Sequence, residues 1–434
     1  MAEPVYGTMQ IKVLGGAGEY GRTSVLITNE KGRFLFDCGT NKSGATTEEQ
    51  YPLLSEEIAA SIDAVFISHS HEDHCSALGY LYALGYDGPV YCTNHTARQI
   101  PYYLENWRKN CEEKGYQLPY SRDDERKINI KELEGITGII DFLDLGVKIQ
   151  WGSSGHIYGA VWYILFLGGK KIFFSGDYHM ESPLFSFLKP DVTNVDVAIL
   201  DTAYGLDERD QQEYTSLLFN KINTTIKNDG SVFLPVPKYG RGQELLLLAL
   251  NYFSRDILRP LIVVEASILL PLQNYIKDIS WLKSGIATTI SSALNEENIV
   301  VVTNQTEREK ALKRDRPKLI FSPDGMLQST VANAYLQELK DDSKNLILLT
   351  GYQSKHSLGQ QLLEKNPYQV QIDVSRFKVH PGFRETRKII GFVDPKTIIV
   401  MHNKKEENDQ VAQFLKEQHQ LKVFSLMSGD AIRI

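Results

Sequence analysis

The sequence predicts an α/β protein of two domains, in which the second domain is inserted within the first. The chain has 434 residues, and chains of this length usually fold around more than one hydrophobic core. Short apolar runs alternate with turns up to about residue 205, and beyond it helix-like and strand-like segments alternate. The segment 397–417 returns to one strand and one helix, so it can rejoin the first domain.

Strands in the first domain are predicted from short apolar runs rich in β-branched and aromatic residues. These runs are 9–14, 23–28, 33–36, 64–68, 89–92, 147–151, 160–167, 171–175 and 197–200. The pattern lengthens to that of a helix at 96–114, and 121–127 is predicted to be a charged connector. Together these segments predict sheets with helices outside them.

The inserted domain has a different pattern, in which helices and strands take turns. The predicted helices are 212–227 and 243–253, and the predicted strands are 231–236, 261–264, 317–322 and 345–350. Such a β-α repeat predicts a parallel sheet and a separate domain. The first domain then resumes with a strand at 397–401 and a helix at 406–417.

The composition bounds the class of protein. Hydrophobic residues make up 42% and charged residues 23% of the chain, as in ordinary globular proteins. No apolar run reaches the roughly 18 residues of a membrane span, and no basic region followed by an apolar stretch opens the chain. We therefore expect a cytoplasmic protein without a membrane partner, and leave open whether it forms a homo-oligomer. The net charge of −7 argues against non-specific coating of nucleic acid, but not against gripping a few phosphates.

The run His69-Ser70-His71-Glu72-Asp73-His74 follows an apolar strand and carries the strongest chemical signal. Imidazole and carboxylate ligands converging from rigid segments are what a zinc site needs. His69 and His71 would project from one turn, while Asp73 and His74 would point the other way at a helix start. Two ligand pairs from one loop favour two metal ions. The alternative is a hydrogen-bonded turn rich in histidine.

Further ligands are expected at other strand ends, where a rigid sheet positions loop residues. His156 follows the strand ending at Trp151, and Asp177 follows the strand 171–175. Alone, each is more typical of a turn, because Gly-His and Gly-Asp are common loop dipeptides. Beside the histidine run they become candidate ligands.

With these motifs the chain resembles the metallo-β-lactamase superfamily over its whole length, since five motifs occur in order. The motifs are Asp37, the histidine run, His156, Asp177 and a late histidine, His402. The resemblance implies an αββα sandwich that binds two zinc ions. It places three histidines (His69, His71, His156) on one zinc, three residues (Asp73, His74, His402) on the other, and Asp177 between them. Asp37 would stand behind the metals, although a plain turn carboxylate explains it equally well.

The inserted domain resembles that of the β-CASP nucleases. Asp201 closes a strand ahead of it, as in the first β-CASP motif, and the segments 235–244, 322–327 and 351–354 look like later β-CASP turns. His380 and His402 fall where the second and third motifs are expected. The resemblance divides the chain into a metallo-β-lactamase domain at 1–204 and 381–434 and an inserted β-CASP domain at 205–380.

Two single positions and one three-residue segment depart from the family pattern. Ser76 and Asn403 stand where glycine is usual, and Pro381-Gly382-Phe383 replaces the small and acidic residues that usually follow the second-motif histidine. Those residues help to seat substrate in family members. The departures therefore bear on the predicted substrate more than on the predicted metal ligands.

The implied mechanism divides its tasks among a few residues. Two zinc ions about 3.5–4 Å apart would hold a hydroxide and polarise phosphoryl oxygens, with Asp73 and Asp177 as catalytic carboxylate ligands. By resemblance, His380 paired with Asp201 would protonate the departing sugar oxygen. Lys238 and Arg241, at the apparent start of the helix 243–253, would bind phosphate; solvent-facing basic residues in a turn are the alternative.

Three functions are compared. The first is a zinc-dependent phosphodiesterase that acts on RNA, or on DNA, in the cleft between the domains. The second is a small-molecule metallo-hydrolase of the same superfamily, cleaving a thioester, lactone or lactam. The third is a binding protein with a lapsed site, which the filled ligand positions disfavour.

Overall fold

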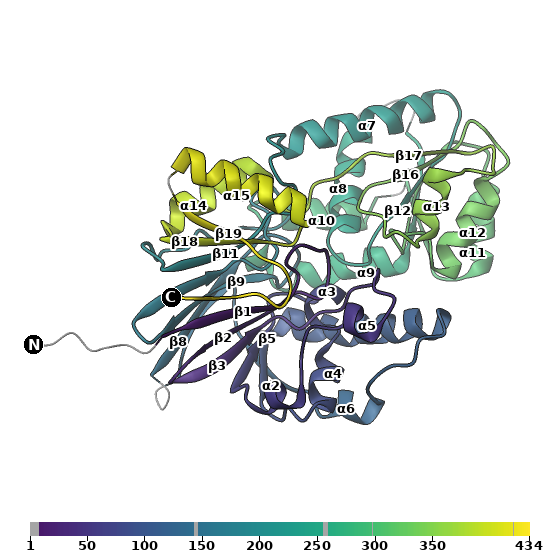
Figure 1. Cartoon of the computed structure of the whole chain (residues 1–434). Helices are drawn as coiled ribbons and strands as arrows, with labels where there is room; N and C mark the ends of the chain where they lie inside the picture. Colours follow the sequence, from purple (N-terminus) through teal and green to yellow (C-terminus); the bar gives the residue numbers. More distant parts are fainter. Residues whose placement is uncertain (1–7, 143–145, 255–258, 297, 420) are drawn as a thin grey trace, which may run out of the picture. The chain divides into compact units, whose positions relative to one another are not determined.

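The computed structural model describes residues 8–142, 146–254, 259–296, 298–419 and 421–434 (Figure 1). These residues fall into two compact units, each described by itself. Unit 1 consists of the described residues within Met1–Met180, Ser186–Glu208 and His380–Ile434. Unit 2 consists of Glu181–Phe185 and the described residues within Arg209–Val379. The segment 181–185 thus groups with unit 2, although the inserted domain was expected to begin at residue 205.

Unit 1 contains two seven-stranded sheets. The first has the order β20 (Ala431–Arg433), β1 (Gln10–Gly15), β2 (Ser24–Asn29), β3 (Gly32–Phe36), β4 (Ala64–Phe66), β5 (Pro89–Thr93), β6 (Asn129–Leu133). The second has the order β19 (Lys422–Ser425), β18 (Thr397–Met401), β11 (Val197–Asp201), β10 (Lys170–Phe174), β9 (Val161–Leu167), β8 (Val147–Ser153), β7 (Thr137–Phe142). Both sheets mix parallel and antiparallel pairs.

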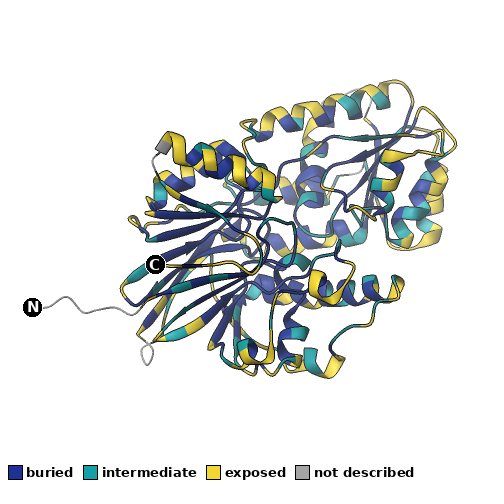
Figure 2. Cartoon of the chain, in the orientation of Figure 1, coloured by how far each residue is buried: buried dark blue, intermediate teal, exposed yellow. Residues whose placement is uncertain are grey.

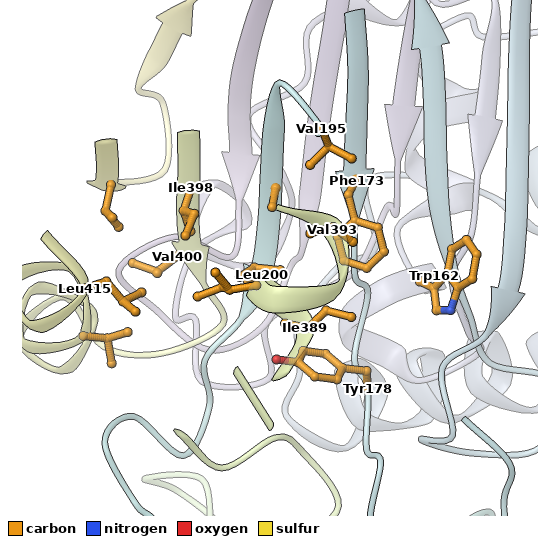
Figure 3. Packing of buried hydrophobic residues seen from close by; sticks show 14 of the residues in the cluster. Trp162, Phe173, Tyr178, Val195, Leu200, Ile389, Val393, Ile398, Val400 and Leu415 are labelled. Atoms are coloured by element: carbon orange, nitrogen blue, oxygen red, sulfur yellow. The ribbon is translucent and has the colours of Figure 1, made fainter. Parts of the chain in front are cut away.

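The two sheets pack face to face through aromatic side chains. The ring centroid of Phe36 on β3 lies 5.5 Å from that of Phe174 on β10, and the centroids of Phe66 and Tyr163 lie 5.7 Å apart. Phe173 precedes Phe174 and therefore points to the opposite face of β10. There it joins a buried cluster with side chains of α14 (Phe383–Val393) and α15 (Lys405–His419) (Figure 3).

Several short helices and one long helix lie between β3 and β6 in the chain. These are α1 (Thr47–Gln50), α2 (Glu56–Ala60), α3 (Glu72–Cys75), α4 (Leu78–Ala83), α5 (Asn94–Glu113) and α6 (Arg122–Arg126). The long helix α5 contacts β5 and β6. Unit 1 is therefore the predicted αββα sandwich, with helices outside two facing sheets.

One local prediction in unit 1 is wrong. The segment 121–127 was expected to be a charged connector, but Arg122–Arg126 forms the helix α6. Ser121 caps this helix by accepting a hydrogen bond from the Asp124 backbone, and the Asp124 side chain accepts one from the Ser121 backbone. This reciprocal capping stabilises a helix that has no buried residue.

Unit 2 is built on one six-stranded sheet, as the β-α repeat predicts. Its order is β14 (Ile299–Val302), β13 (Leu261–Glu265), β15 (Lys318–Ser322), β12 (Val232–Pro235), β16 (Leu346–Leu349), β17 (Gln371–Val374). All its pairs are parallel. The connecting helices are α7 (Gln211–Lys227), α8 (Arg241–Phe253), α9 (Ala266–Tyr275), α10 (Ile286–Leu294), α11 (Gln305–Leu312), α12 (Thr330–Leu339) and α13 (Leu358–Glu364).

Burial follows the layers of each unit. The central strands are buried, whereas the helices expose one face (Figure 2). Among the described residues, none of the helices combines the length and apolar character that a membrane span requires.

Candidate metal centre

The predicted ligands lie at the carboxyl ends of unit 1 strands. His69 and His71 follow β4, and the short helix α3 then carries Asp73 and His74. The remaining ligands follow the strands of the second sheet: His156 after β8, Asp177 after β10 and His402 after β18. Strands that end at one edge thus deliver side chains to one place.

Three histidine rings converge in a first group. Nδ1 of His71 lies 3.1 Å from Nε2 of His69 and 3.1 Å from Nε2 of His156. Oδ2 of Asp177 lies 3.5 Å from each of these Nε2 atoms. A tetrahedral zinc ion with bonds of about 2.0–2.1 Å separates its ligand atoms by about 3.3 Å. The spacing of this group therefore fits one zinc ion.

A second group forms on the other side of Asp177. Nε2 of His402 lies 3.1 Å from Oδ2 of Asp73, and Nε2 of His74 lies 3.7 Å from the same oxygen. Oδ1 of Asp177 lies 3.3 Å from the His74 nitrogen and 3.8 Å from the His402 nitrogen. Asp177 thus presents Oδ2 to the first group and Oδ1 to the second, as a bridging carboxylate must.

Asp37 stands behind the second group and orients it. Its side chain is fully buried and accepts hydrogen bonds from the Ser68 backbone at 2.7 Å and the Ser68 hydroxyl at 2.8 Å. Its Oδ2 lies 2.7 Å from Nδ1 of His74. Burial raises the pKa of Asp37, against the lowering effect of His74. The contact turns Nε2 of His74 toward Asp177, which is the arrangement expected of a residue supporting a metal ligand.

The electrostatics of the two groups differ. Burial lowers the pKa of His71 to about 4 and that of His69 well below its ordinary value. Burial also opposes protonation of His74 and His402, but the surrounding carboxylates outweigh it and raise both pKa values. Burial disfavours the charge on Asp177, yet the neighbouring histidines hold the pKa of this carboxyl well below its ordinary value. Neutral imidazoles and an ionised carboxylate are the forms that bind metal ions.

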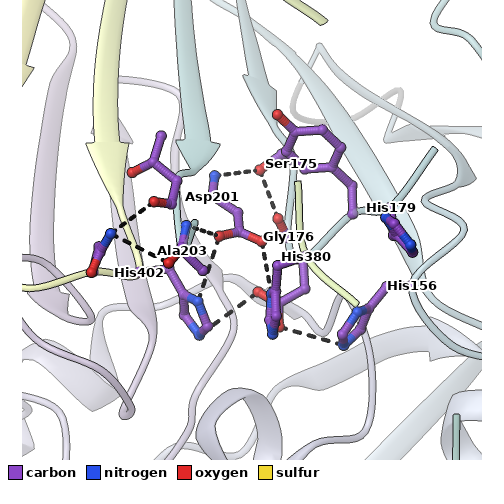
Figure 4. A network of polar contacts seen from close by, with 12 residues as sticks. His156, Ser175, Gly176, His179, Asp201, Ala203, His380 and His402 are labelled. Atoms are coloured by element: carbon purple, nitrogen blue, oxygen red, sulfur yellow. Dashed lines mark hydrogen bonds and ion pairs between the residues drawn. The ribbon is translucent and has the colours of Figure 1, made fainter. Parts of the chain in front are cut away.

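His380 and Asp201 lie beside each other (Figure 4) and close to Asp177. Nδ1 of His380 lies 3.0 Å from Oδ2 of Asp201 and 3.6 Å from Oδ2 of Asp177. Oδ1 of Asp201 accepts a hydrogen bond from the Ala203 backbone at 2.8 Å and lies 3.6 Å from Nδ1 of His402. The pair predicted from the sequence is therefore in contact, next to both ligand groups.

Comparison with known proteins identifies the family. A model of the metallo-beta-lactamase superfamily matches residues 17–222, and a model of the Beta-Casp domain matches residues 243–362. Residues 17–222 therefore belong to the metallo-β-lactamase superfamily. The second match adds a β-CASP domain, so the resemblance of both parts is confirmed.

Individual relatives agree along the chain. An RNase J-like protein of Methanocaldococcus jannaschii is 28% identical over 98% of this chain and 99% of its own. The transcription termination factor FttA of the same organism is 24% identical over 98% of this chain and 72% of its own. A crystal structure of a protein of unknown function from Enterococcus faecalis has a similar fold, with a TM-score of 0.61 at 14% identity over 98% of this chain and 100% of that one.

The predicted phosphate-binding residues lie in unit 2, away from these groups in the chain. Lys238 belongs to the turn after β12, and Arg241 is the first residue of α8. The turn is closed by Gly240, whose positive φ of 86° suits glycine, and by the Gln243 amide, which donates to the Lys238 carbonyl at 2.8 Å. Phosphate binding by these two residues stays a prediction.

The metallo-β-lactamase motifs did not reveal every residue that builds the centre. Glu385 on α14 is fully buried and accepts hydrogen bonds from the backbone of Met180 at 2.6 Å and of Gly382 at 3.0 Å. Its Oε1 also lies 3.2 Å from Nδ1 of His179. It therefore ties the loop after Asp177 to the loop after His380. A glutamate three positions after a glycine, at the start of an amphipathic helix, is the signal that could have found it.

The two cysteines near the motifs lie in the interior of unit 1. Cys38 and Cys75 are fully buried, and burial raises the pKa of each thiol. A buried thiol with a raised pKa is a poor nucleophile and a poor metal ligand. These two residues contribute to packing.

Proposed function

We propose that this chain is a hydrolase with two zinc ions that cleaves phosphodiester bonds in RNA. The observation that carries the proposal is the position of Asp177, which presents one oxygen to each of two ligand groups. Each group supplies three further ligand atoms from the predicted set of residues. The donor types, imidazole and carboxylate, suit zinc.

The chemistry follows from this arrangement. Two zinc ions, when bound, supply Lewis acidity toward phosphoryl oxygens and lower the pKa of water. Asp177 would fix the separation of the two ligand groups, and Asp37 would hold His74 in orientation. His380, with Nδ1 directed at Asp201, would hold a proton at Nε2 for the departing sugar oxygen.

RNA is the substrate class that the relatives favour. One relative is named an RNase J-like protein and another a transcription termination factor, and both match 98% of this chain. Neither name supports a thioester, lactone or lactam as substrate. We propose a cytoplasmic site of action, with single-stranded RNA as the first substrate to test.

The test is cleavage of a labelled single-stranded RNA, together with elemental analysis of the reconstituted protein. We expect two zinc ions per chain, cleavage that a chelator abolishes and added zinc restores, and loss of cleavage in Asp177→Asn. Asp191→Asn is the matched control, because Asp191 accepts a hydrogen bond from Gln150 outside the ligand groups. It should keep full activity. A zinc-loaded wild type that leaves RNA intact but opens a thioester, lactone or lactam would refute the proposal.

A further inference from the structure

The first ligand group is built from two loops, which are joined by a hydrogen bond from the Val161 backbone to the Ser68 carbonyl at 3.0 Å and by contacts with the helix α5. His69 and His71 come from the loop after β4, whereas His156 comes from the loop after β8. The distance of 3.1 Å between the ring nitrogens of His71 and His156 requires that both loops keep their relative position. The hydrogen bonds that join the two loops therefore bear on how well the three rings fit a metal ion.

Gln99 on α5 contacts both loops at once. Its Oε1 accepts a hydrogen bond from the hydroxyl of Ser70 at 2.8 Å, and Ser70 stands between the two histidines of the first loop. Its Nε2 donates to the backbone carbonyl of Tyr158 at 2.9 Å, two residues after His156. The side chain is buried, with 6% of its surface exposed, so water does not compete strongly for these bonds.

Other hydrogen bonds hold each of the two loops beside Gln99. Thr93 and Thr96, at the start of α5, both donate to the Gly159 carbonyl, at 2.7 and 3.1 Å. Gly159 has a φ of 93°, and a Cβ atom there would lie 2.7 Å from the His95 Cβ, so the second loop is pressed against the helix. On the other loop, the Cys75 thiol donates to the Ser70 carbonyl. The two segments are thus fixed beside the carboxamide.

We propose that Gln99 is a positioning residue that sets the spacing of the His69–His71 turn and the His156 loop, and thereby the metal affinity of the first ligand group. This inference rests on the proposed metal centre. A carboxamide of this length is needed because it donates through nitrogen and accepts through oxygen from one rigid plane. Glutamate at neutral pH cannot donate to the Tyr158 carbonyl, and methionine can neither donate nor accept strongly.

The experiment measures the two metal dissociation constants separately in Gln99→Met. Zinc is titrated against a competing chelator, and cobalt(II) absorption reports the geometry of each ligand group. We expect the affinity of the first group to fall about 10-fold, at the lower end of the range for residues that support metal ligands, and that of the second group to stay unchanged. Gln50→Met is the matched control, since Gln50 is 5% exposed and donates to the Gly44 carbonyl, apart from the ligands. It should lose comparable thermal stability and no zinc affinity.

A double-mutant cycle with Ser70→Ala separates positioning from a general loss of packing. If Gln99 acts through Ser70, the double variant should weaken zinc binding at the first group by less than the product of the two single effects. Equal weakening of both ligand groups, or full multiplication of the two effects, would overturn the inference. A wild type that binds two zinc ions and cleaves RNA, with Gln99→Met indistinguishable from it, would overturn the inference and leave the proposed function standing. A wild type that binds no zinc would overturn both.

Discussion

His380→Ala should remove a proton donor and leave the metal ligands in place. Nδ1 of His380 faces Asp201 at 3.0 Å, while each ligand group already has three residues of its own besides Asp177. The side chain is 19% exposed, so part of the ring can meet a substrate. We therefore expect both zinc ions to remain bound in the variant.

The size of the effect follows from the leaving group. A positioned general acid contributes about 10²–10⁴ in rate, or roughly 3–5 kcal/mol of barrier. An RNA phosphodiester departs as a sugar alkoxide and needs this proton, so its cleavage should slow by about that factor. A phosphodiester with a nitrophenolate leaving group departs without protonation, and its cleavage should slow by less than about tenfold. Asp201→Asn should show the same selectivity more weakly, because Asp201 only orients the ring.

The assay compares kcat/KM on both esters with zinc content measured on the same samples. His356→Ala is the control, since His356 belongs to unit 2 and lies on its surface. It should match wild type on both esters. Loss of a zinc ion from His380→Ala, or an equal rate loss on the two esters, would show that His380 is a ligand or a packing residue and would refute its assignment as general acid.

Three further predictions concern the ligands and one buried acid. Asp177→Ala should lower the zinc affinity of both ligand groups, whereas His402→Ala should lower mainly that of the second group. If stepwise titrations show the same loss of zinc affinity in both variants, the bridging role of Asp177 is contradicted. Asp37→Asn should weaken zinc at the His74 group by about 10–100-fold in the same titration, and an unchanged affinity would exclude the orienting contact. Burial raises the pKa of Glu244 to about 7 from 4.5, so the stability of wild type relative to Glu244→Gln should fall by about 3 kcal/mol as pH rises through that window. Unfolding at about pH 5 and pH 8 measures this, and parallel changes in both proteins would contradict it.

The sequence predicted the central strands well and the edge strands poorly, for a physical reason. β9 is buried on both faces and therefore reads as a continuous apolar run. β6 and β7 are the terminal strands of their sheets, and their exposed positions carry polar residues such as Lys131 and Asp141. Without a clear apolar pattern at 129–142, neither strand was predicted. β20 was not predicted for the same reason, since only one of its three residues is buried.

The candidate ligand groups could be predicted from the sequence because their residues are chemically distinctive and several of them are closely spaced. A histidine run in H-x-H-x-D-H order carries its own signal, and His156, Asp177 and His402 then follow from the family motifs. Gln99 has no such signal, because a glutamine in a helix usually faces solvent. Its partners lie 29 and 59 positions away in the chain, so only the folded structure brings them together.

Asn403, one of the departures from the β-CASP pattern, makes hydrogen bonds that a glycine could not make. Asn403, in place of the usual glycine, is fully buried, donates to the Thr202 carbonyl at 2.9 Å and accepts from the Tyr20 hydroxyl at 2.6 Å. These bonds tie the segment after His402 to the segment after Asp201. An asparagine here therefore adds a side-chain link between these two segments that a glycine could not provide.

The segment after His380, where the chain also departs from the family pattern, is likewise tied to another loop by hydrogen bonds. Gly382 begins α14, and its backbone N–H donates to Glu385, which also binds the backbone of Met180 after Asp177. Full burial keeps the Glu385 carboxylate from solvent and hence from substrate. Glu385 thus holds two loops together. It does not replace the substrate-binding residues that family members usually have at the positions of Pro381-Gly382-Phe383. The candidate metal ligands and the His380–Asp201 pair keep their places beside these altered segments.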